Sequence, residues 1–222
     1  MSVSRSRHRR KARPRPAVFL DRDGVLNRCA VRDGKPYAPR RLRDFRLLPG
    51  VPAAVRALKD AGFLLVVVTN QPDIGNGLVA AATVAAMHDR LRARLPLDAI
   101  ELCPHGQAAG CGCRKPKPGM LLRAARRFGI SLADSVMVGD RSGDVAAGKA
   151  AGCRTIFIDR RYRESGPVGA DAIARSLPAA VRLILAGTLR PSRVPSRRQN
   201  AMRACGQEAS RAGSGARQGT AR

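Results

Sequence analysis

Two carboxylates one residue apart follow a short apolar run near the start of the chain, in the stretch Ala17-Val18-Phe19-Leu20-Asp21-Arg22-Asp23-Gly24. The run 17–20 has the length of a buried strand, and Asp21 and Asp23 stand at its end. Gly24 can adopt a positive φ, so the chain can turn there and bring both carboxylates over one site. Two such acids repel each other unless a cation lies between them, and Mg²⁺ prefers oxygen ligands. The stretch therefore predicts a reaction centre, although Asp and Gly are also ordinary turn residues.

Polar side chains also follow two later apolar runs. Thr69 and Asn70 come directly after such a run, and their hydroxyl and amide groups suit phosphate oxygens or could simply cap a strand. Asp140 follows another run, in a position like that of Asp21. Asp144, four residues further on, is either a second acid on the same side of a helix turn or a charge favoured at a helix start.

A basic stretch, Arg114-Lys115-Pro116-Lys117-Pro118, precedes a predicted helix that begins at Gly119. The N-terminus of a helix already favours anions, so cations placed there predict a phosphate-binding site. The prolines stiffen the stretch and would help to hold Lys115 in one place. The alternative is a charged linker on the surface.

Four soft or borderline metal ligands, Cys103, His105, Cys111 and Cys113, lie within eleven residues of one another. Such a set can close a tetrahedral Zn²⁺ site, and with all four positions filled by protein the metal would be structural. A disulfide between Cys111 and Cys113, or chance clustering, is the alternative. The remaining three cysteines have no such partners, and we expect Cys153 to pack in the core.

Strands and helices alternate through the middle of the chain, which predicts an α/β fold: a Rossmann-like, mostly parallel sheet with helices on both faces. In such sheets ligands bind beyond the carboxyl ends of the strands, where Asp21, Thr69 and Asp140 would meet if their strands are neighbours. The predicted strands are 17–20, 63–68, 99–102, 136–138 and 155–158, and the predicted helices are 53–61, 80–95, 119–128, 144–151 and 177–186.

The composition is unusually basic, with a formal net charge of +26, and much of the charge lies at the two ends. Residues 1–16 hold seven Lys or Arg and no acid, and residues 188–222 hold eight Arg and one acid. We predict disordered basic tails there and one domain at 17–187, with an irregular loop at 28–49 that could cover a substrate. An alternative from a different class is an inactive scaffold that binds nucleic acid through its tails.

The longest apolar run, 63–68, is far too short to span a membrane, and the basic N-terminus lacks the apolar core of a signal peptide. An organelle transit peptide would also be basic and poor in acids, so that alternative stays open. We expect a cytoplasmic monomer with a small-molecule substrate.

Four stretches, in chain order, resemble the successive motifs of phosphatases of the haloacid dehalogenase superfamily, and the resemblance covers residues 17–187. Within the superfamily, the stretches resemble the zinc-containing branch, whose members act on heptose 1,7-bisphosphate or on histidinol phosphate. The stretches are Asp21-Arg22-Asp23-Gly24-Val25-Leu26-Asn27, Val68-Thr69-Asn70-Gln71, Cys111-Gly112-Cys113-Arg114-Lys115-Pro116 and Val138-Gly139-Asp140-Arg141.

The resemblance implies a role for each matching residue. Asp21 would be the nucleophile that forms an aspartyl-phosphate, and Asp23 the general acid and base. Mg²⁺ would be held by Asp21, Asp140 and the backbone carbonyl of Asp23. The residues expected around the substrate and its phosphate are Thr69, Asn70, Gln71, Arg114, Lys115 and Arg141, and those expected around zinc are Cys103, His105, Cys111 and Cys113.

Two differences from the family pattern bear on the substrate. Many members carry Ser-Gly-Ile after the Thr-Asn-Gln motif, whereas Pro72-Asp73-Ile74 follows here and places an acid near the substrate mouth. The short spacing between His105 and Cys111 resembles the histidinol-phosphate members. Leu26-Asn27 and the stretch 116–120 resemble the heptose members, and we favour heptose bisphosphate, with histidinol phosphate as the alternative.

Overall fold

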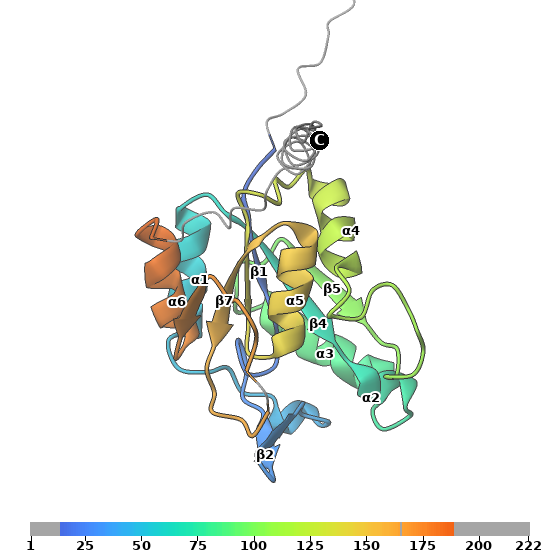
Figure 1. Ribbon diagram of the computed structural model, residues 1–222. Coiled ribbons are helices and arrows are strands. Elements are labelled where there is room, and N and C mark those ends of the chain that lie inside the picture. Colours follow the sequence, from blue (N-terminus) through green and yellow to red (C-terminus); the bar gives the residue numbers. More distant parts are fainter. Residues whose placement is uncertain (1–13, 165, 189–222) are drawn as a thin grey trace, which may run out of the picture. The chain divides into compact units, whose positions relative to one another are not determined.

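The computed structural model of the protein describes residues 14–164 and 166–188. Most of the two predicted tails, 1–13 and 189–222, therefore lies outside the described residues. The described part contains a six-stranded parallel sheet with the strand order β5-β4-β1-β6-β7-β8 (Figure 1). These strands are β1 (Ala17–Leu20), β4 (Leu64–Asn70), β5 (Ala99–Cys103), β6 (Val136–Gly139), β7 (Arg154–Ile158) and β8 (Ala172–Ala174).

Strand β1 lies inside the sheet, between β4 and β6. All four of its residues are buried, as expected for a short apolar strand with neighbours on both sides. Ala17 pairs with Leu64 on β4, and Val18 pairs with Val136 on β6. Asp21 and Asp140 directly follow β1 and β6, and Thr69 lies near the end of β4. Because these three strands are direct neighbours, their carboxyl ends meet at one edge of the sheet.

Helices cover both faces of the sheet, which confirms the predicted α/β architecture (Figure 1). Because side chains alternate along a strand, Val18 and Leu20 of β1 point into one core cluster and Ala17 and Phe19 into the other. The first cluster includes buried side chains of α1 (Val51–Asp60), α3 (Ala81–Arg92) and α6 (Leu177–Leu185), and the second includes those of α4 (Gly119–Phe128) and α5 (Ser142–Ala151). Cys153 is buried in the second cluster, as predicted.

The expectation of an irregular loop at 28–49 was wrong in part. This segment contains an antiparallel hairpin of β2 (Ala30–Arg32) and β3 (Lys35–Tyr37), followed by a short 3-10 helix, η1 (Leu42–Asp44). The two turn residues, Asp33 and Gly34, have φ values of 51° and 76°. Asp-Gly with positive φ at both positions is typical of a two-residue hairpin turn, so the sequence contained the signal.

Two smaller differences follow from short segments with little periodicity. The one-turn helix α2 (Pro72–Gly75) and the strand β8 were not predicted. Among the described residues, the Arg15 N–H donates to the Gly129 carbonyl at 3.0 Å, and the expected tail boundary at residue 16 stays a prediction. None of the helices within 14–164 and 166–188 is long and apolar enough to cross a membrane.

Candidate active site

Asp21 and Lys115 form a buried ion pair at the carboxyl end of β1. The backbone N–H of Asp21 donates to the Val138 carbonyl at 2.9 Å, which fixes the first residue after the strand against β6. The Lys115 ammonium lies 2.8 Å from Asp21 Oδ1 and donates to the Val68 carbonyl on β4, also at 2.8 Å. A cation expected from the basic stretch before α4 therefore reaches the predicted nucleophile.

Asp144 is the second acidic partner of Lys115, with Oδ1 2.6 Å from Nζ. Its other oxygen accepts a hydrogen bond from the Arg141 backbone N–H at 3.0 Å, so Asp144 also caps the start of α5. Both interpretations of this residue were thus correct, although it was not among the predicted site residues. Its spacing of four from Asp140 was the available signal.

Three buried carboxylates, from Asp21, Asp140 and Asp144, have oxygen atoms within 4.8 Å of one another. Burial is the largest cause that raises the pKa of Asp21, Lys115 opposes it, and the charges of Asp144 and Asp23 add to the rise, so the pKa reaches about 7. Burial and the charge of Asp21 likewise raise the pKa of Asp140 well above its usual range. Asp140 Oδ1 is buried without a hydrogen-bond partner among the described residues. Oxygen ligands crowded in this way fit a hard cation such as Mg²⁺.

The carboxylate of Asp23 does not join this cluster. The Arg22 guanidinium holds it with Nη2 at 2.9 Å and Nε at 3.1 Å from Oδ2. Asn27 Nδ2 donates to Asp23 Oδ1 at 2.9 Å, and Gln71 Nε2 donates to Asp23 Oδ2 at 2.6 Å. The expected contribution of Asp23 to a metal site is its backbone carbonyl, which stays a prediction, and its side chain is instead fixed beside Asp21 by four donor groups.

Arg22 and His88 form a buried support for Asp23 that the sequence did not reveal. Arg22 is fully buried, stacks over the Phe45 ring at 5.7 Å, and places Nη1 3.3 Å from His88 Nε2. Burial, together with the positive charge of Arg22, lowers the pKa of His88 to about 4. His88 is therefore neutral at physiological pH, and Nε2 can accept a hydrogen bond from Arg22. Nothing in the sequence separates this histidine on α3 from a core residue.

The motif after β4 positions other site residues. Asn70 makes a reciprocal pair with the backbone of Lys115, accepting from its N–H at 3.1 Å and donating to its carbonyl at 3.0 Å. Gln71 Nε2 also donates to the Thr69 hydroxyl at 2.9 Å, in addition to its contact with Asp23. Asn70 and Gln71, predicted to contact substrate, thus fix Lys115 and Asp23, and Thr69 lies buried beside them.

An open cavity of about 550 Å³ lies over these groups. Lys35 and Tyr37 of the hairpin line one wall, so the segment 28–49 lies where a substrate-covering element was expected. Asp73, the acid expected at the mouth, lines the cavity and pairs with Arg40 at 2.6 Å. This ion pair links the segment after the hairpin to α2 across the rim of the cavity.

The other predicted cations of the site differ in how they are engaged. Arg114 lines the cavity, and its Nη1 is buried without a hydrogen-bond partner among the described residues. Arg141 also lines the cavity, but Glu164 holds its guanidinium, with 2.6 Å between Nε and Oε2. Arg114 is therefore the one with a donor free for an incoming anion, whereas Arg141 is already paired.

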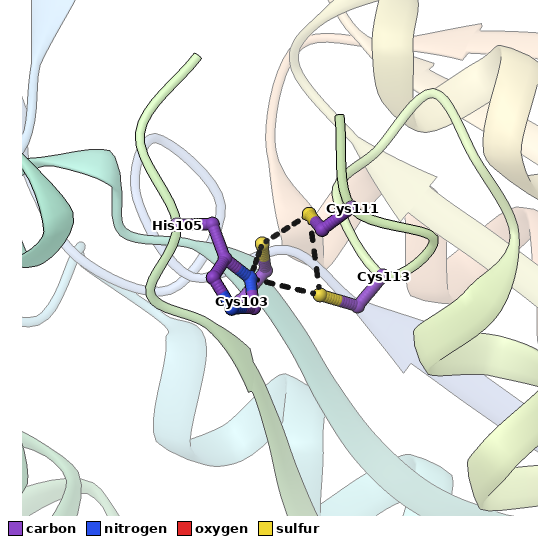
Figure 2. A group of neighbouring side chains, drawn as sticks. All are labelled: Cys103, His105, Cys111 and Cys113. Atoms are coloured by element: carbon purple, nitrogen blue, oxygen red, sulfur yellow. Dashed lines mark hydrogen bonds between the residues drawn. The ribbon is translucent and has the colours of Figure 1, made fainter. Parts of the chain in front are cut away.

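The four predicted zinc ligands point toward one another (Figure 2). Cys103 Sγ lies 3.6 Å from His105 Nδ1 and 3.7 Å from Cys111 Sγ, and Cys113 Sγ lies 3.3 Å and 3.5 Å from the same two atoms. In a tetrahedral site with Zn–S near 2.3 Å and Zn–N near 2.0 Å, ligand atoms are roughly 3.4–3.8 Å apart. The alternative of a disulfide between Cys111 and Cys113 was wrong, because both are free thiols.

A parallel sheet with a cluster of acids and a lysine at its carboxyl edge is typical of a class of α/β hydrolases. The comparison with known families identifies which family of this class the chain resembles. The model of the haloacid dehalogenase-like hydrolases matches residues 28–152. The chain belongs to this family. The match begins after Asp21 and Asp23, so the position of these two acids at the end of β1 is independent support.

Relatives of the chain carry a more specific name. A D-glycero-beta-D-manno-heptose-1,7-bisphosphate 7-phosphatase from Pseudomonas putida is 40% identical over 177 residues, which cover 76% of this chain and 98% of the relative. A relative from Mycobacterium bovis, named for the alpha anomer of the same sugar, is 39% identical over 152 residues, covering 64% of this chain and 78% of its own length. Relatives named for either anomer therefore share similar identity with this chain.

Among solved structures, the D,D-heptose 1,7-bisphosphate phosphatase from B. bronchiseptica, determined with magnesium and phosphate, superposes with a TM-score of 0.68. It is 33% identical, and the alignment covers 78% of this chain and 99% of that one. The shared fold thus extends over nearly the whole of that phosphatase.

Proposed function

We propose that the protein is a Mg²⁺-dependent phosphatase that removes the 7-phosphate of D-glycero-D-manno-heptose 1,7-bisphosphate. The observation that carries the chemistry is the buried contact of Asp21 with Lys115, beside the free oxygen of Asp140. The names of the relatives support the substrate. The expectations of a cytoplasmic location and of a monomer stay predictions.

In the first step a carboxylate oxygen of Asp21 attacks phosphorus, and the bond from phosphorus to the sugar oxygen breaks as the new bond forms. Asp23, in its protonated form, gives its proton to the leaving sugar oxygen. The products of this step are the free hydroxyl of the sugar and an aspartyl-phosphate on Asp21. The contacts of Arg22, Asn27 and Gln71 with the Asp23 carboxylate support this role, because they hold it at a fixed place near Asp21.

In the second step Asp23 takes a proton from water, which attacks the aspartyl-phosphate, releases inorganic phosphate and regenerates the Asp21 carboxylate. Lys115 stabilises the negative oxygens of the transferring phosphoryl group, with the Thr69 hydroxyl beside it. The carboxylates of Asp21 and Asp140 would hold Mg²⁺, whereas the carboxylate of Asp144 is paired with Lys115. When bound, Mg²⁺ offsets the repulsion between these carboxylates and the phosphate.

The cavity contains cations beyond those that contact Asp21. Arg114 has a buried guanidinium nitrogen free for an anion, and Lys35 lies on the hairpin wall. A substrate with a second phosphate gives these cations a partner, whereas the imidazole and amine of histidinol phosphate would lie among cations. The distribution of charge therefore supports a bisphosphate.

A panel of phosphate-release assays tests the substrate. The two anomers of heptose 1,7-bisphosphate, histidinol phosphate and a short 5′-phosphorylated oligonucleotide are compared by kcat/KM at saturating Mg²⁺. We expect a heptose bisphosphate to exceed the other two classes by roughly a hundredfold or more, the range of one charged contact that is lost. A higher kcat/KM for histidinol phosphate or for the oligonucleotide would contradict the substrate while leaving the phosphatase mechanism in place.

We also propose a structural zinc ion between Cys103, His105, Cys111 and Cys113. Hydrogen bonds from the Arg114 backbone N–H and from Cys113 outweigh the effect of burial and lower the pKa of Cys111 to about 6. A thiolate, the form that binds zinc, is therefore available there at neutral pH. The surrounding loop connects β5 to Lys115, so the metal would hold the segment that delivers Lys115 to Asp21.

Elemental analysis should find about one zinc per chain in the wild type and much less in Cys111→Ser, because three ligands bind far more weakly than four. Cys29→Ala is the matched control, since this thiol lies outside the cluster and the variant should keep its zinc. We expect Cys111→Ser to unfold at a lower temperature and to be cleaved faster by protease between residues 103 and 115. A stable, zinc-free wild type would refute the site.

A further inference from the structure

The segment that follows β7, residues 159–164, contacts groups at the centre of the site. Arg160 Nε donates to the Gly24 carbonyl at 2.7 Å, and Tyr162 donates its hydroxyl to Asp140 Oδ2 at 2.9 Å. Both contacts reach groups that follow central strands, and Tyr162 lies 22 residues later in the chain than Asp140. Neither Arg160 nor Tyr162 is part of any motif considered so far.

The two oxygens of Asp140 have different surroundings. Oδ2 accepts the hydrogen bond from Tyr162, whereas Oδ1 is buried without a partner among the described residues. The Asp140 carboxylate as a whole belongs to the cluster with Asp21 and Asp144. A carboxylate can rotate about its Cβ–Cγ bond unless one oxygen is held. The hydroxyl of Tyr162 supplies that restraint, and the oxygen left over is the one available to a cation.

The packing around Tyr162 leaves little room for another arrangement. Gly24 has a φ of 81°, and a side-chain carbon at this position would overlap Asp140 and come within 3.0 Å of the Tyr162 hydroxyl. The Arg160 contact with the carbonyl of Gly24 holds the same turn from the other side. Gly24, Asp140 and Tyr162 are therefore in mutual contact, and the absence of a side chain at residue 24 permits it.

We propose that Tyr162 is a positioning residue for the metal site: its hydroxyl fixes the Asp140 carboxylate so that Oδ1 faces the cation. The inference rests on the magnesium-dependent function proposed above and adds a residue from outside the family motifs. Groups that orient a metal ligand by a hydrogen bond commonly change metal affinity by about 10- to 100-fold when they are removed. The phenol itself contacts neither the phosphate nor Asp21 in this assignment.

The effects of two neighbouring side chains must be distinguished from that of the hydrogen bond between Tyr162 and Asp140. The Cys29 thiol is also close to Tyr162, so loss of the hydroxyl alters the surroundings of Cys29. Glu164, two residues on, pairs with Arg141 and would affect the site through a different side chain. Tyr162→Phe leaves Glu164 unchanged, and Cys29→Ala removes the thiol while it leaves the contact between Tyr162 and Asp140 intact.

The test measures Mg²⁺ binding without substrate, by isothermal titration and by the rise in melting temperature with Mg²⁺ concentration. Tyr162→Phe should raise the Kd for Mg²⁺ by about 10-fold or more, whereas Cys29→Ala and Tyr37→Phe should leave it within about twofold. The melting temperature of Tyr162→Phe without Mg²⁺ should stay close to that of the wild type. In turnover assays kcat should recover as Mg²⁺ is raised to saturation, because the variant still has every proposed ligand.

Three results would overturn the inference. If Tyr162→Phe binds Mg²⁺ as tightly as the wild type does, Tyr162 does not position Asp140. If Cys29→Ala weakens binding as much as Tyr162→Phe does, the effect belongs to the packing around Cys29. If the wild type itself binds no Mg²⁺, the proposed function fails together with this inference. In the first two cases the wild type binds Mg²⁺, so only the inference fails.

Discussion

Asp21→Asn should lower kcat by at least about four orders of magnitude, the scale seen when the nucleophile of a covalent mechanism is removed. The amide nitrogen cannot attack phosphorus, and the remaining oxygen is a far weaker nucleophile than a carboxylate. Lys115, Asp140 and the cavity stay in place, so substrate should still bind. The measurement is phosphate release under single-turnover and steady-state conditions, with binding followed separately by titration.

The same substitution should not destabilise the metal-free protein. Burial and neighbouring acids raise the pKa of Asp21 to about 7, so its charged form costs free energy in the native state above the unfolded pKa of 3.8. Asparagine removes this charge and keeps an oxygen that can accept from Lys115. Asp89→Asn, on the exposed side of α3, is the control and should keep normal kcat. A fully active Asp21→Asn enzyme would end the proposal of an aspartyl-phosphate.

The sequence was sufficient to predict the architecture because most helices and strands are marked by apolar patterns and end signals within their own residues. Helix α4 was predicted with its observed bounds, since Pro118 precedes it and Gly129 ends it in the left-handed conformation. The buried strands β1 and β4 are continuous apolar runs that stop at polar residues. Placing Asp21 and Asp140 at one edge then required only that their strands be neighbours, which the strand order confirms.

The contacts that organise the site were harder to predict because they join residues far apart in the chain. Arg22 contacts His88 across 66 positions, and Tyr162 contacts Asp140 across 22. Neither histidine nor tyrosine stands in a local pattern that distinguishes it from a packed or exposed residue. The contact of Asn70 with the backbone of Lys115 was not predicted for a related reason: it joins a strand end to a loop 45 residues later in the chain. The predicted contact of Asn70 with substrate stays a prediction, and Asn70 lines the cavity.

Lys115→Met should reduce both stability and activity, because Lys115 is the cation among three buried carboxylates. Its ammonium lies 2.8 Å from Asp21 and 2.6 Å from Asp144, and without it both acids are buried with no positive partner there. Breaking a buried ion pair by removing one partner costs about 3–5 kcal/mol, and losing a donor to the phosphoryl group costs about 10²–10³ in kcat. Chemical denaturation without metal measures the first effect, and phosphate release the second.

The dependence on pH and Mg²⁺ distinguishes loss of charge from loss of packing. The pKa of Asp21 is already about 7, and without Lys115 it should rise further, so the variant should recover stability relative to the wild type as the pH falls through that higher pKa toward about 7 and this acid becomes neutral. Mg²⁺ should restore part of the stability at neutral pH, since a cation then lies among the carboxylates again. Lys117→Met is the matched control, because the ammonium of this exposed lysine donates to the Gly110 carbonyl, away from the carboxylate cluster, and the variant should change neither quantity by more than about 0.5 kcal/mol or twofold. A Lys115→Met variant whose deficit were the same at pH 5 and pH 8, with and without Mg²⁺, would show that the methylene chain of Lys115, rather than its charge, holds the site together.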